Sequence, residues 1–311
     1  MTAPPSAAEI DPPRAAAAAS LPGRIAFLGF GLIGGSIAMA LREAGYGGEL
    51  IAWTPNGSGP SEGKRRGVLD ATADGARAAL RAADLVILAG PPLEMLETIR
   101  ALGDELASDL GPRATITDVV STKASIVDEA SSSGLRFVGG HPMAGRESTG
   151  VGAATADLFV GRPWVIVPAS SATPADVGRV EALARAVGAM PVRMTAAEHD
   201  AAVASISHLP LVMAAALVES VAGNPDASGW QTARALAASG WRDTTRLARG
   251  DPGMGAGILA TNSAQVADRL AETRDVLDSW IDALRSDGID AGALRARLEA
   301  ARTALEDGTE A

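Results

Sequence analysis

The chain has 311 residues, 47% of them hydrophobic, which is enough for one large domain or two ordinary ones whose cores need no covalent cross-links. It contains no cysteine, so thiolate nucleophiles, zinc–thiolate sites and cysteine-held iron–sulfur clusters are excluded. The formal net charge is −10, and no basic run is longer than Lys64-Arg65-Arg66. We therefore expect no nucleic acid partner. We also expect no metal, and we expect a cytoplasmic protein.

The first 22 residues are rich in Ala and Pro, and we expect residues 1–22 to form a disordered tail. Two uncharged stretches, 25–41 and 201–218, approach the length of a membrane span. Glycines interrupt the first, and His208 and Pro210 interrupt the second. We therefore predict that neither crosses a membrane.

Between Arg24 and Met194, short apolar runs alternate with helical patterns. The strands are predicted at 24–30, 49–54, 85–90, 115–120, 137–139 and 164–167, and the clearest helices at 33–44, before Gly45, and at 93–102, after Pro91-Pro92. This alternation predicts an α/β fold, a parallel, doubly wound sheet of the Rossmann type over residues 23–195.

After Met194 the strand-like runs stop, and we predict an all-α domain over residues 196–311. The stretch 201–218 is apolar nearly all round, which indicates a helix buried on every side, whereas 264–284 is amphipathic. A helical domain with such a central helix favours a homodimer.

The sequence Gly29-Phe-Gly31-Leu-Ile-Gly34 follows the first predicted strand and opens a helix. This G-x-G-x-x-G pattern allows a tight turn, lets a pyrophosphate approach the backbone, and directs N–H groups of the helix start toward it. It predicts dinucleotide binding. The predicted cofactor-binding residues are Gly29, Gly31, Leu32, Ile33, Gly34, Thr54, Asn56 and Pro91.

The second strand ends in Ala52-Trp53-Thr54-Pro55-Asn56, without the acidic residue that binds the adenosine ribose in NAD-preferring sites. Thr54, Asn56 and Ser58 can donate to a 2′-phosphate, and Arg65 or Arg66 can lie nearby. This favours NADP. A neutral loop that accepts NAD as well remains the alternative.

Two candidate catalytic residues follow neighbouring strands. His141 stands in Gly139-Gly-His-Pro-Met-Ala-Gly145, and Ser121 in Asp118-Val-Val-Ser-Thr-Lys123. Open α/β sheets bind ligands at the carboxyl ends of their strands, so both side chains can meet beside the nicotinamide.

At this point the sequence resembles the prephenate and arogenate dehydrogenases of tyrosine biosynthesis, over nearly the whole chain from Arg24 to about Leu284. The resemblance rests on four motifs: the glycine loop to Ser36, Thr117-Asp-Val-Val-Ser-Thr-Lys123, Gly139-Gly-His-Pro-Met-Ala-Gly-Arg-Glu147, and a helical set of Glu198-His-Asp200, Ser207-His-Leu-Pro210 and Gly240-Trp-Arg-Asp-Thr-Thr-Arg246.

The resemblance implies oxidative decarboxylation of a cyclohexadiene that carries a ring carboxylate and a C4 hydroxyl. It implies that His141 takes the hydroxyl proton, that Ser121 helps to position this group, and that Arg246 binds substrate carboxylate. Asp243 is expected to orient Arg246. His208 either lines the pocket or packs between helices, and His199 is expected to be structural.

Two departures from the family pattern concern the substrate. Family members that act on prephenate often have His where this chain has Leu211, and many have Trp where it has Gly255. Arogenate carries an ammonium where prephenate has a keto group, so a cationic histidine there is unfavourable. The departures favour an NADP-dependent arogenate dehydrogenase.

Three alternatives remain open. The first is a prephenate or dual-specificity cyclohexadienyl dehydrogenase. The second is a non-catalytic dinucleotide-binding redox sensor, for which Ser121, His141 and Arg246 have no purpose. The third is a β-hydroxyacid dehydrogenase, which needs a lysine in its helical domain, and no lysine follows Lys123.

Overall fold

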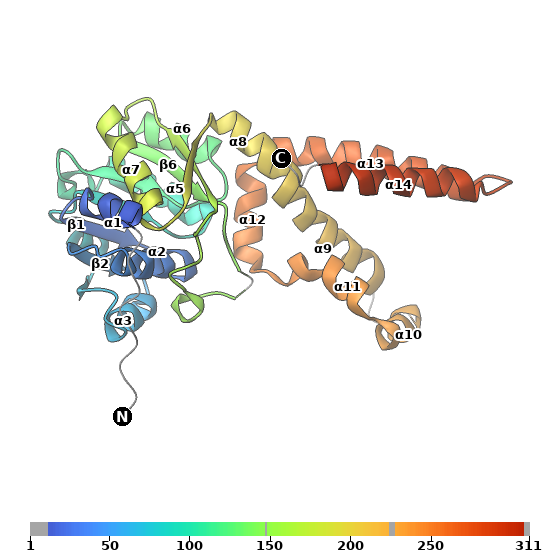
Figure 1. Cartoon of the computed structure of the whole chain (residues 1–311), viewed down its shortest axis with the longest axis horizontal. Helices are drawn as coiled ribbons and strands as arrows, with labels where there is room; N and C mark the ends of the chain where they lie inside the picture. Colours follow the sequence, from blue (N-terminus) through green and yellow to red (C-terminus); the bar gives the residue numbers. More distant parts are fainter. Residues whose placement is uncertain (1–11, 147, 224–227, 308–311) are drawn as a thin grey trace. The chain divides into compact units, whose positions relative to one another are not determined.

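The computed structural model describes residues 12–146, 148–223 and 228–307 (Figure 1). The chain divides into two compact units, residues 1–263 and residues 264–311. The first unit contains the sheet and most of the helices. The second consists of two helices.

Eight strands form one sheet in the first unit. They are β1 Arg24–Leu28, β2 Glu49–Trp53, β3 Ala71–Thr72, β4 Leu85–Leu88, β5 Thr115–Asp118, β6 Phe137–Pro142, β7 Pro163–Pro168 and β8 Met190–Arg193. Their order is β3-β2-β1-β4-β5-β6-β7-β8. Strands β1 to β6 pair in parallel, as predicted, but β7 runs antiparallel to β6 and parallel to β8. The doubly wound sheet is confirmed, and the expectation that all its strands are parallel is wrong for the last two.

The helices of this unit cover both faces of the sheet and then continue beyond it. They are α1 Pro12–Ala19, α2 Leu32–Glu43, α3 Ser58–Arg65, α4 Ala76–Leu80, α5 Pro92–Gly103, α6 Ala124–Ser132, α7 Pro174–Ala186, α8 Ala196–Val203, α9 Leu209–Ala222, α10 Ser228–Leu236, α11 Ser239–Thr244 and α12 Pro252–Thr261, with 3₁₀ turns η1 Ala107–Asp109, η2 Val151–Ala153 and η4 Arg246–Arg249 and a π-helical turn η3 Ala204–His208.

Side chains alternate along β1 between two separate cores. Ile25 and Phe27 pack with apolar residues of α1, α2 and α7, whereas Ala26 and Leu28 pack with those of α4, α5 and α6 (Figure 1). This arrangement puts helices on both faces of the sheet and leaves the carboxyl ends of its parallel strands to form the site.

The predicted disordered tail is wrong for residues 12–19, which form α1. Ala18 is buried, and Arg14 Nε donates to the carbonyl oxygen of Ala186 at the end of α7, at 3.2 Å. Alanine has the highest helix propensity, and the apolar face of α1 packs against the sheet domain. Leu21, in the described segment 20–22 between α1 and β1, is buried as well, whereas residues 1–11 of the predicted tail lie outside the described residues.

Strands give way to helices between Arg193 and Ala196, beside the domain boundary predicted at residue 195, which stays a prediction. Within this chain alone, the stretch 201–218 is not buried on every side: within α9 only Ala214 is buried. By length and composition alone, 196–222 is the one helical stretch of the described residues able to cross a membrane, and 22% of its apolar window is buried. An apolar helix that is buried against a second protein chain meets the same criteria of length and composition.

The second unit contains α13 (Ser263–Arg285, apart from its first residue) and α14 Ala291–Asp307. The guanidinium of Arg297 lies over the ring of Trp280, with 4.0 Å between its carbon and the ring centroid. Several large apolar side chains of these helices are exposed, among them Ile281, Leu284 and Leu298. The predicted amphipathic helix over 264–284 is confirmed by α13.

Candidate active site

The glycine loop connects β1 to α2 and lies against the turn after β4. Gly29 has φ +96°, and a Cβ there would come within 2.3 Å of the carbonyl oxygen of Ala89. A Cβ on Gly34 would be 3.2 Å from the carbonyl oxygen of Gly29, whereas one on Gly31 would meet nothing within 4 Å. The first glycine is therefore required by the backbone and the third by close packing of helix on strand. Gly31 keeps open the space in front of the helix start.

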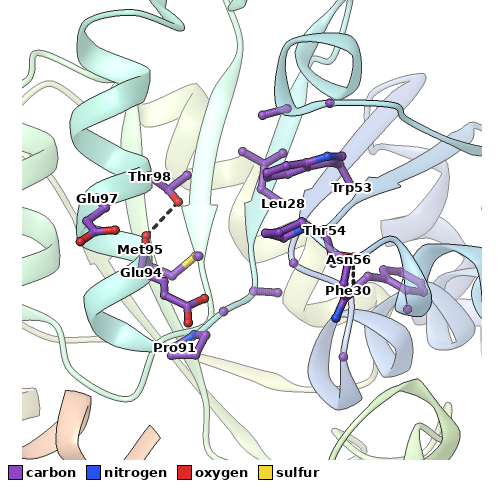
Figure 2. A pocket seen from close by; sticks show the side chains of 18 of the residues that line it. Leu28, Phe30, Trp53, Thr54, Asn56, Pro91, Glu94, Met95, Glu97 and Thr98 are labelled. Atoms are coloured by element: carbon purple, nitrogen blue, oxygen red, sulfur yellow. Dashed lines mark hydrogen bonds between the residues drawn. The ribbon is translucent and has the colours of Figure 1, made fainter. Parts of the chain in front are cut away.

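A cavity of about 1230 Å³ lies in front of this loop (Figure 2). Of the predicted cofactor residues, Gly29, Gly31, Thr54, Asn56 and Pro91 line it, and Leu32, Ile33 and Gly34 do not. The last three lie in the first turn of α2, where their backbone rather than their side chains can serve a ligand. A cavity of this size, lined by glycines that precede the N-terminus of a helix, fits a dinucleotide.

The two walls of the cavity differ in charge (Figure 2). Trp53, Thr54 and Asn56, at the end of β2, form one wall and carry no carboxylate, whereas Glu94 and Glu97 of α5 stand on the other. The lining also includes Glu105 and one cation, Arg77, which is paired with Asp109 at 2.6 Å. Neither Arg77 nor the acidic wall was anticipated from the sequence.

Hydrogen bonds hold the loop after β2 in one conformation. The Asn56 Oδ1 accepts from the backbone N–H and the hydroxyl of Ser58, at 3.1 and 3.0 Å, and the Gly57 N–H donates to Thr54 Oγ1 at 3.1 Å. These contacts use the oxygen of Asn56 and leave its amide nitrogen as the group that can donate to a ligand. Arg65 and Arg66, expected near this loop, both pair with Glu62 of α3, and Arg66 also donates to the carbonyl oxygen of Val151, which lines the cavity, at 3.4 Å.

At the carboxyl ends of β5 and β6, one carboxylate joins the two strands; the predicted catalytic residues beside it, Ser121 and His141, do not line the cavity. Asp118 accepts from the backbone N–H of Val120 at 2.9 Å and of Gly140 at 3.0 Å, and it pairs with the ammonium of Lys123. The Asp118 and Lys123 side chains are both fully buried. Since Val120 precedes Ser121 and Gly140 precedes His141, Asp118 fixes the backbone beside both predicted catalytic residues. His141 lies within β6, which extends three residues beyond the strand predicted at 137–139.

His141 is the first member of a buried hydrogen-bonded chain of three side chains. Its Nδ1 is 2.8 Å from Nε2 of His199, and the Nδ1 of His199 is 2.7 Å from Oδ1 of Asp200. Asp200 also accepts from the backbone N–H groups of Lys123 and Ala124 at 2.8 and 2.9 Å, at the N-terminus of α6. His199 therefore contacts the predicted base directly and is not only a packing residue of α8.

Burial and neighbouring groups set the charge of this chain. Burial lowers the pKa of His141 well below the ordinary value of 6.5, and the nearby His199, Lys123 and His208 lower it further. Burial raises the pKa of Asp200, but the hydrogen bonds from His199 and from the two backbone N–H groups outweigh it and leave the pKa lowered. At neutral pH His141 is thus neutral and Asp200 is a carboxylate.

His208 ends the π-helical turn η3, which interrupts the helix between α8 and α9. Such turns are frequent at functional sites. The Asn262 amide lies 3.2 Å from Nδ1 of His208 and donates to the carbonyl oxygen of Asp200 at 2.9 Å. The Nε2 of His208 is buried and has no hydrogen-bond partner among the described residues. Burial lowers the pKa of His208 to about 4, so this ring is neutral.

The remaining predicted residues are more exposed. Ser121 is half-buried and lies three residues beyond the end of β5. Arg246 begins η4 and Asp243 lies in α11, and both side chains are exposed. The hydrogen bonds that join His141 to its neighbours do not include them. Among the residues the structure describes, no group of three or more acidic or histidine side chains could hold a metal ion.

Comparisons with known proteins identify the family. A family model described as "Prephenate dehydrogenase, nucleotide-binding domain" matches residues 37–193, and one described as "Prephenate dehydrogenase, dimerization domain" matches residues 195–299. The prephenate dehydrogenase of Bacillus subtilis is 34% identical over 261 residues, which cover 83% of this chain and 67% of that protein.

Two solved structures are similar over almost the whole chain. The arogenate dehydrogenase of Synechocystis has a TM-score of 0.75 and 31% identity, and the match covers 91% of this chain and 99% of that one. The prephenate dehydrogenase of A. aeolicus, in complex with hydroxyphenyl propionate and NAD+, has a TM-score of 0.80 and 26% identity, covering 94% and 99%. With both family models matched in order and a relative at this identity, the chain belongs to the prephenate dehydrogenase family.

Proposed function

We propose that this chain is an NADP-dependent arogenate dehydrogenase, which oxidises and decarboxylates arogenate to tyrosine. Its family makes it an NAD(P)-dependent dehydrogenase, and the substrate and the cofactor preference are the proposal. The observation that carries the chemistry is the buried, neutral His141 at the carboxyl edge of the sheet. A neutral imidazole is the form that can accept a proton.

The reaction needs orientation and one proton acceptor. When bound, the nicotinamide cofactor supplies the acceptor for the hydride that leaves C4 of the ring. His141 accepts the proton of the C4 hydroxyl as the C4–O bond gains double-bond character. The bond to the ring carboxylate breaks, carbon dioxide leaves, and its electron pair completes the aromatic ring. His141 then returns the proton to the phenolic oxygen, so no net proton is released.

Other residues hold the substrate in this proposal. Ser121 donates to the C4 oxygen and orients it toward His141. Arg246 binds a carboxylate through its fork of donors, and Asp243 orients Arg246. His208 binds a substrate oxygen, which its structure supports: because its Nδ1 accepts from Asn262, its buried Nε2 carries a proton and has no partner among the described residues.

The cofactor is held by the glycine loop and the wall at the end of β2. Open space at Gly31, at the start of α2, fits the pyrophosphate. The absence of a carboxylate between Thr54 and Ser58, together with the donor amide of Asn56, supports NADP. NAD binding by the same neutral loop is the second candidate, and the A. aeolicus relative was solved with NAD+.

The preference for arogenate is supported by two residues that lie close together. A Cβ on Gly255 in α12 would lie 3.6 Å from Cδ2 of Leu211 in α9, an ordinary van der Waals distance. The two departures from the prephenate pattern therefore lie side by side, and neither residue carries a charge. These two residues do not repel the ammonium of arogenate, whereas a protonated histidine at position 211 would.

Substitution of Leu211 tests the preference. We expect Leu211→His to lower kcat/KM for arogenate relative to prephenate by at least about tenfold, the size expected of one added like charge. Leu211→Gln, which is polar but uncharged, is the matched control and should change the ratio less. An unchanged ratio in Leu211→His contradicts the assignment of Leu211 to the substrate side chain.

Substitution of His141 separates an enzyme from a redox sensor. We expect His141→Asn to lower turnover at least about a hundredfold and to leave cofactor affinity nearly unchanged, because a general base acts on the chemical step. Wild-type turnover on either substrate excludes the sensor. Unchanged turnover in His141→Asn contradicts the proposed role of His141. A prephenate or dual-specificity enzyme remains the alternative if prephenate is used equally well.

We also propose a homodimer formed through the helical region. Only one residue of the apolar helix α9 is buried within the chain, so a second chain can bury much of its remaining apolar surface. The matching family model also describes a dimerization domain. Light scattering at micromolar concentration should give twice the chain mass of 31.4 kDa. A monomeric mass contradicts this. A cytoplasmic location stays a prediction.

A further inference from the structure

His141 can act as a base only if the nitrogen that faces the substrate carries a lone pair. We propose that Asp200 and His199 are positioning residues that fix the tautomer of His141, with the proton on Nδ1 and the lone pair on Nε2. The inference deepens the proposed function, since it explains how this chain prepares the base of that reaction.

The side chain of Asp200 is the acceptor in its hydrogen bonds with Lys123, Ala124 and His199. Two backbone N–H groups, those of Lys123 and Ala124, donate to its two oxygens at the start of α6. A carboxylate with these partners, at a helix N-terminus, stays ionised and cannot donate. The Nδ1 of His199, 2.7 Å from the same carboxylate, must therefore carry a proton.

The proton positions of the two rings follow from this one. In this proposal His199 carries one proton, on Nδ1, so its Nε2 has a lone pair. The atom 2.8 Å from that lone pair is Nδ1 of His141, which must then be the donor. The second nitrogen of His141, Nε2, is left without a proton and is free to accept one. The opposite tautomer of His141 would set two lone pairs against each other inside the protein, where an unmade hydrogen bond is costly.

The same chain serves His141 after it has accepted the proton. The other charged or titratable groups that act on His141 are Lys123, at the start of α6, and His208, at the end of η3, and both disfavour its positive charge. The carboxylate of Asp200, reached through His199, is the anion that opposes them. Asp200 and His199 therefore both orient the ring and stabilise the imidazolium that forms during the reaction.

The chain offers a direct measurement because it has three histidines. In protein labelled with ¹⁵N-histidine, the nitrogen chemical shifts and couplings distinguish protonated from bare ring nitrogens. For His141, assigned by its loss in His141→Asn, we expect a protonated Nδ1 and a bare Nε2, with and without cofactor. A proton on Nε2 of His141 in the wild-type protein overturns the inference, whatever the activity of the enzyme.

Two substitutions of His199 test its role through turnover. His199→Leu removes the acceptor for His141, and we expect a mixture of His141 tautomers and a loss of kcat of at least about a hundredfold. His199→Gln restores an acceptor but not the link to Asp200, so it should keep the wild-type tautomer of His141 and lose less kcat. A loss confined to KM, or equal losses of kcat in both variants, contradicts the positioning role.

The matched control weakens the helix that carries His199 without touching the hydrogen-bonded chain. Thr195 caps α8 reciprocally with Glu198, and we expect Thr195→Ala to lower stability but leave kcat within about twofold. If Thr195→Ala lowers kcat as much as His199→Leu, His199 acts only through stability and the inference fails. If His141 has the expected tautomer but His141→Asn keeps full turnover, the proposed catalytic role fails and the structural inference stands.

Discussion

Replacing Lys123 by Met removes the ammonium of a fully buried ion pair and leaves the carboxylate of Asp118 behind. The methionine fills much of the space of the lysine side chain, so the main change is the loss of charge. Asp118 keeps two donors, the backbone N–H groups of Val120 and Gly140, but no positive charge at contact distance. The carboxylate then either stays ionised in an apolar surrounding or takes up a proton and weakens those two hydrogen bonds.

The expected cost follows from the burial. Both side chains have no exposed surface, and breaking one partner of such a pair costs about 3–5 kcal/mol of unfolding free energy. For a chain of this size that corresponds to a fall in Tm of roughly 10 °C. Because Asp118 fixes the backbone beside Ser121 and His141, we also expect kcat to fall while the affinity for the cofactor is kept.

The assay is urea unfolding followed by circular dichroism, with Arg100→Met as the control. Arg100 pairs with Glu129 at 2.8 Å between α5 and α6, but 58% of the arginine side chain is exposed, so its loss should cost less than about 1 kcal/mol. The double variant Asp118→Asn/Lys123→Met should be more stable than Lys123→Met alone, since it leaves no unpaired charge. Equal losses in Lys123→Met and Arg100→Met would refute the reasoning.

Three further predictions concern the base and the cofactor loop. Since burial lowers the pKa of His141 and its neutral form is the base, kcat/KM should stay high as the pH falls to 6.5 and decline only below it; a decline centred above 6.5 contradicts this. Gly29→Ala, whose Cβ would overlap the carbonyl oxygen of Ala89, should weaken cofactor binding in a titration more than about tenfold, whereas Gly23→Ala, with nothing within 4 Å, should not; equal affinities contradict this. Asn56→Asp should lower the ratio of kcat/KM with NADP to that with NAD by at least about tenfold, because a carboxylate repels a 2′-phosphate, and an unchanged ratio would remove Asn56 from the site.

Patterns that repeat along the chain predicted the architecture correctly, and single short runs did not. Alternating strands and helices gave the doubly wound sheet, but the direction of β7 depends on where the chain re-enters the sheet, which the composition of 163–168 does not encode. The alanine-rich segment 12–19 resembled a tail because its packing partner, α7, lies more than 150 residues away. Likewise, the apolar stretch 201–218 indicated burial without indicating what covers it.

For the site, sequence reasoning located residues near strand ends and missed those that reach them from other elements. The glycine loop and His141 can be identified from their sequence motifs and from their positions after predicted strands. His199 and Asp200 stand on α8, about 60 residues after His141, and only the fold brings them to its ring. The available signals were the place of Glu198-His-Asp200 among the motifs of the family resemblance and the adjacency of a histidine and an aspartate in a chain with three histidines. Asn262 carries no such signal, because a single amide at a helix end is usually a cap.

The measurement that tests the central claim most directly is a matrix of kcat/KM values for two substrates and two cofactors. Purified protein is assayed with arogenate or prephenate, each with NADP or NAD, by the appearance of reduced nicotinamide. The account predicts that arogenate with NADP gives the highest value, at least about tenfold above each of the other three combinations. Faster oxidation of prephenate, or a clear preference for NAD, would contradict it.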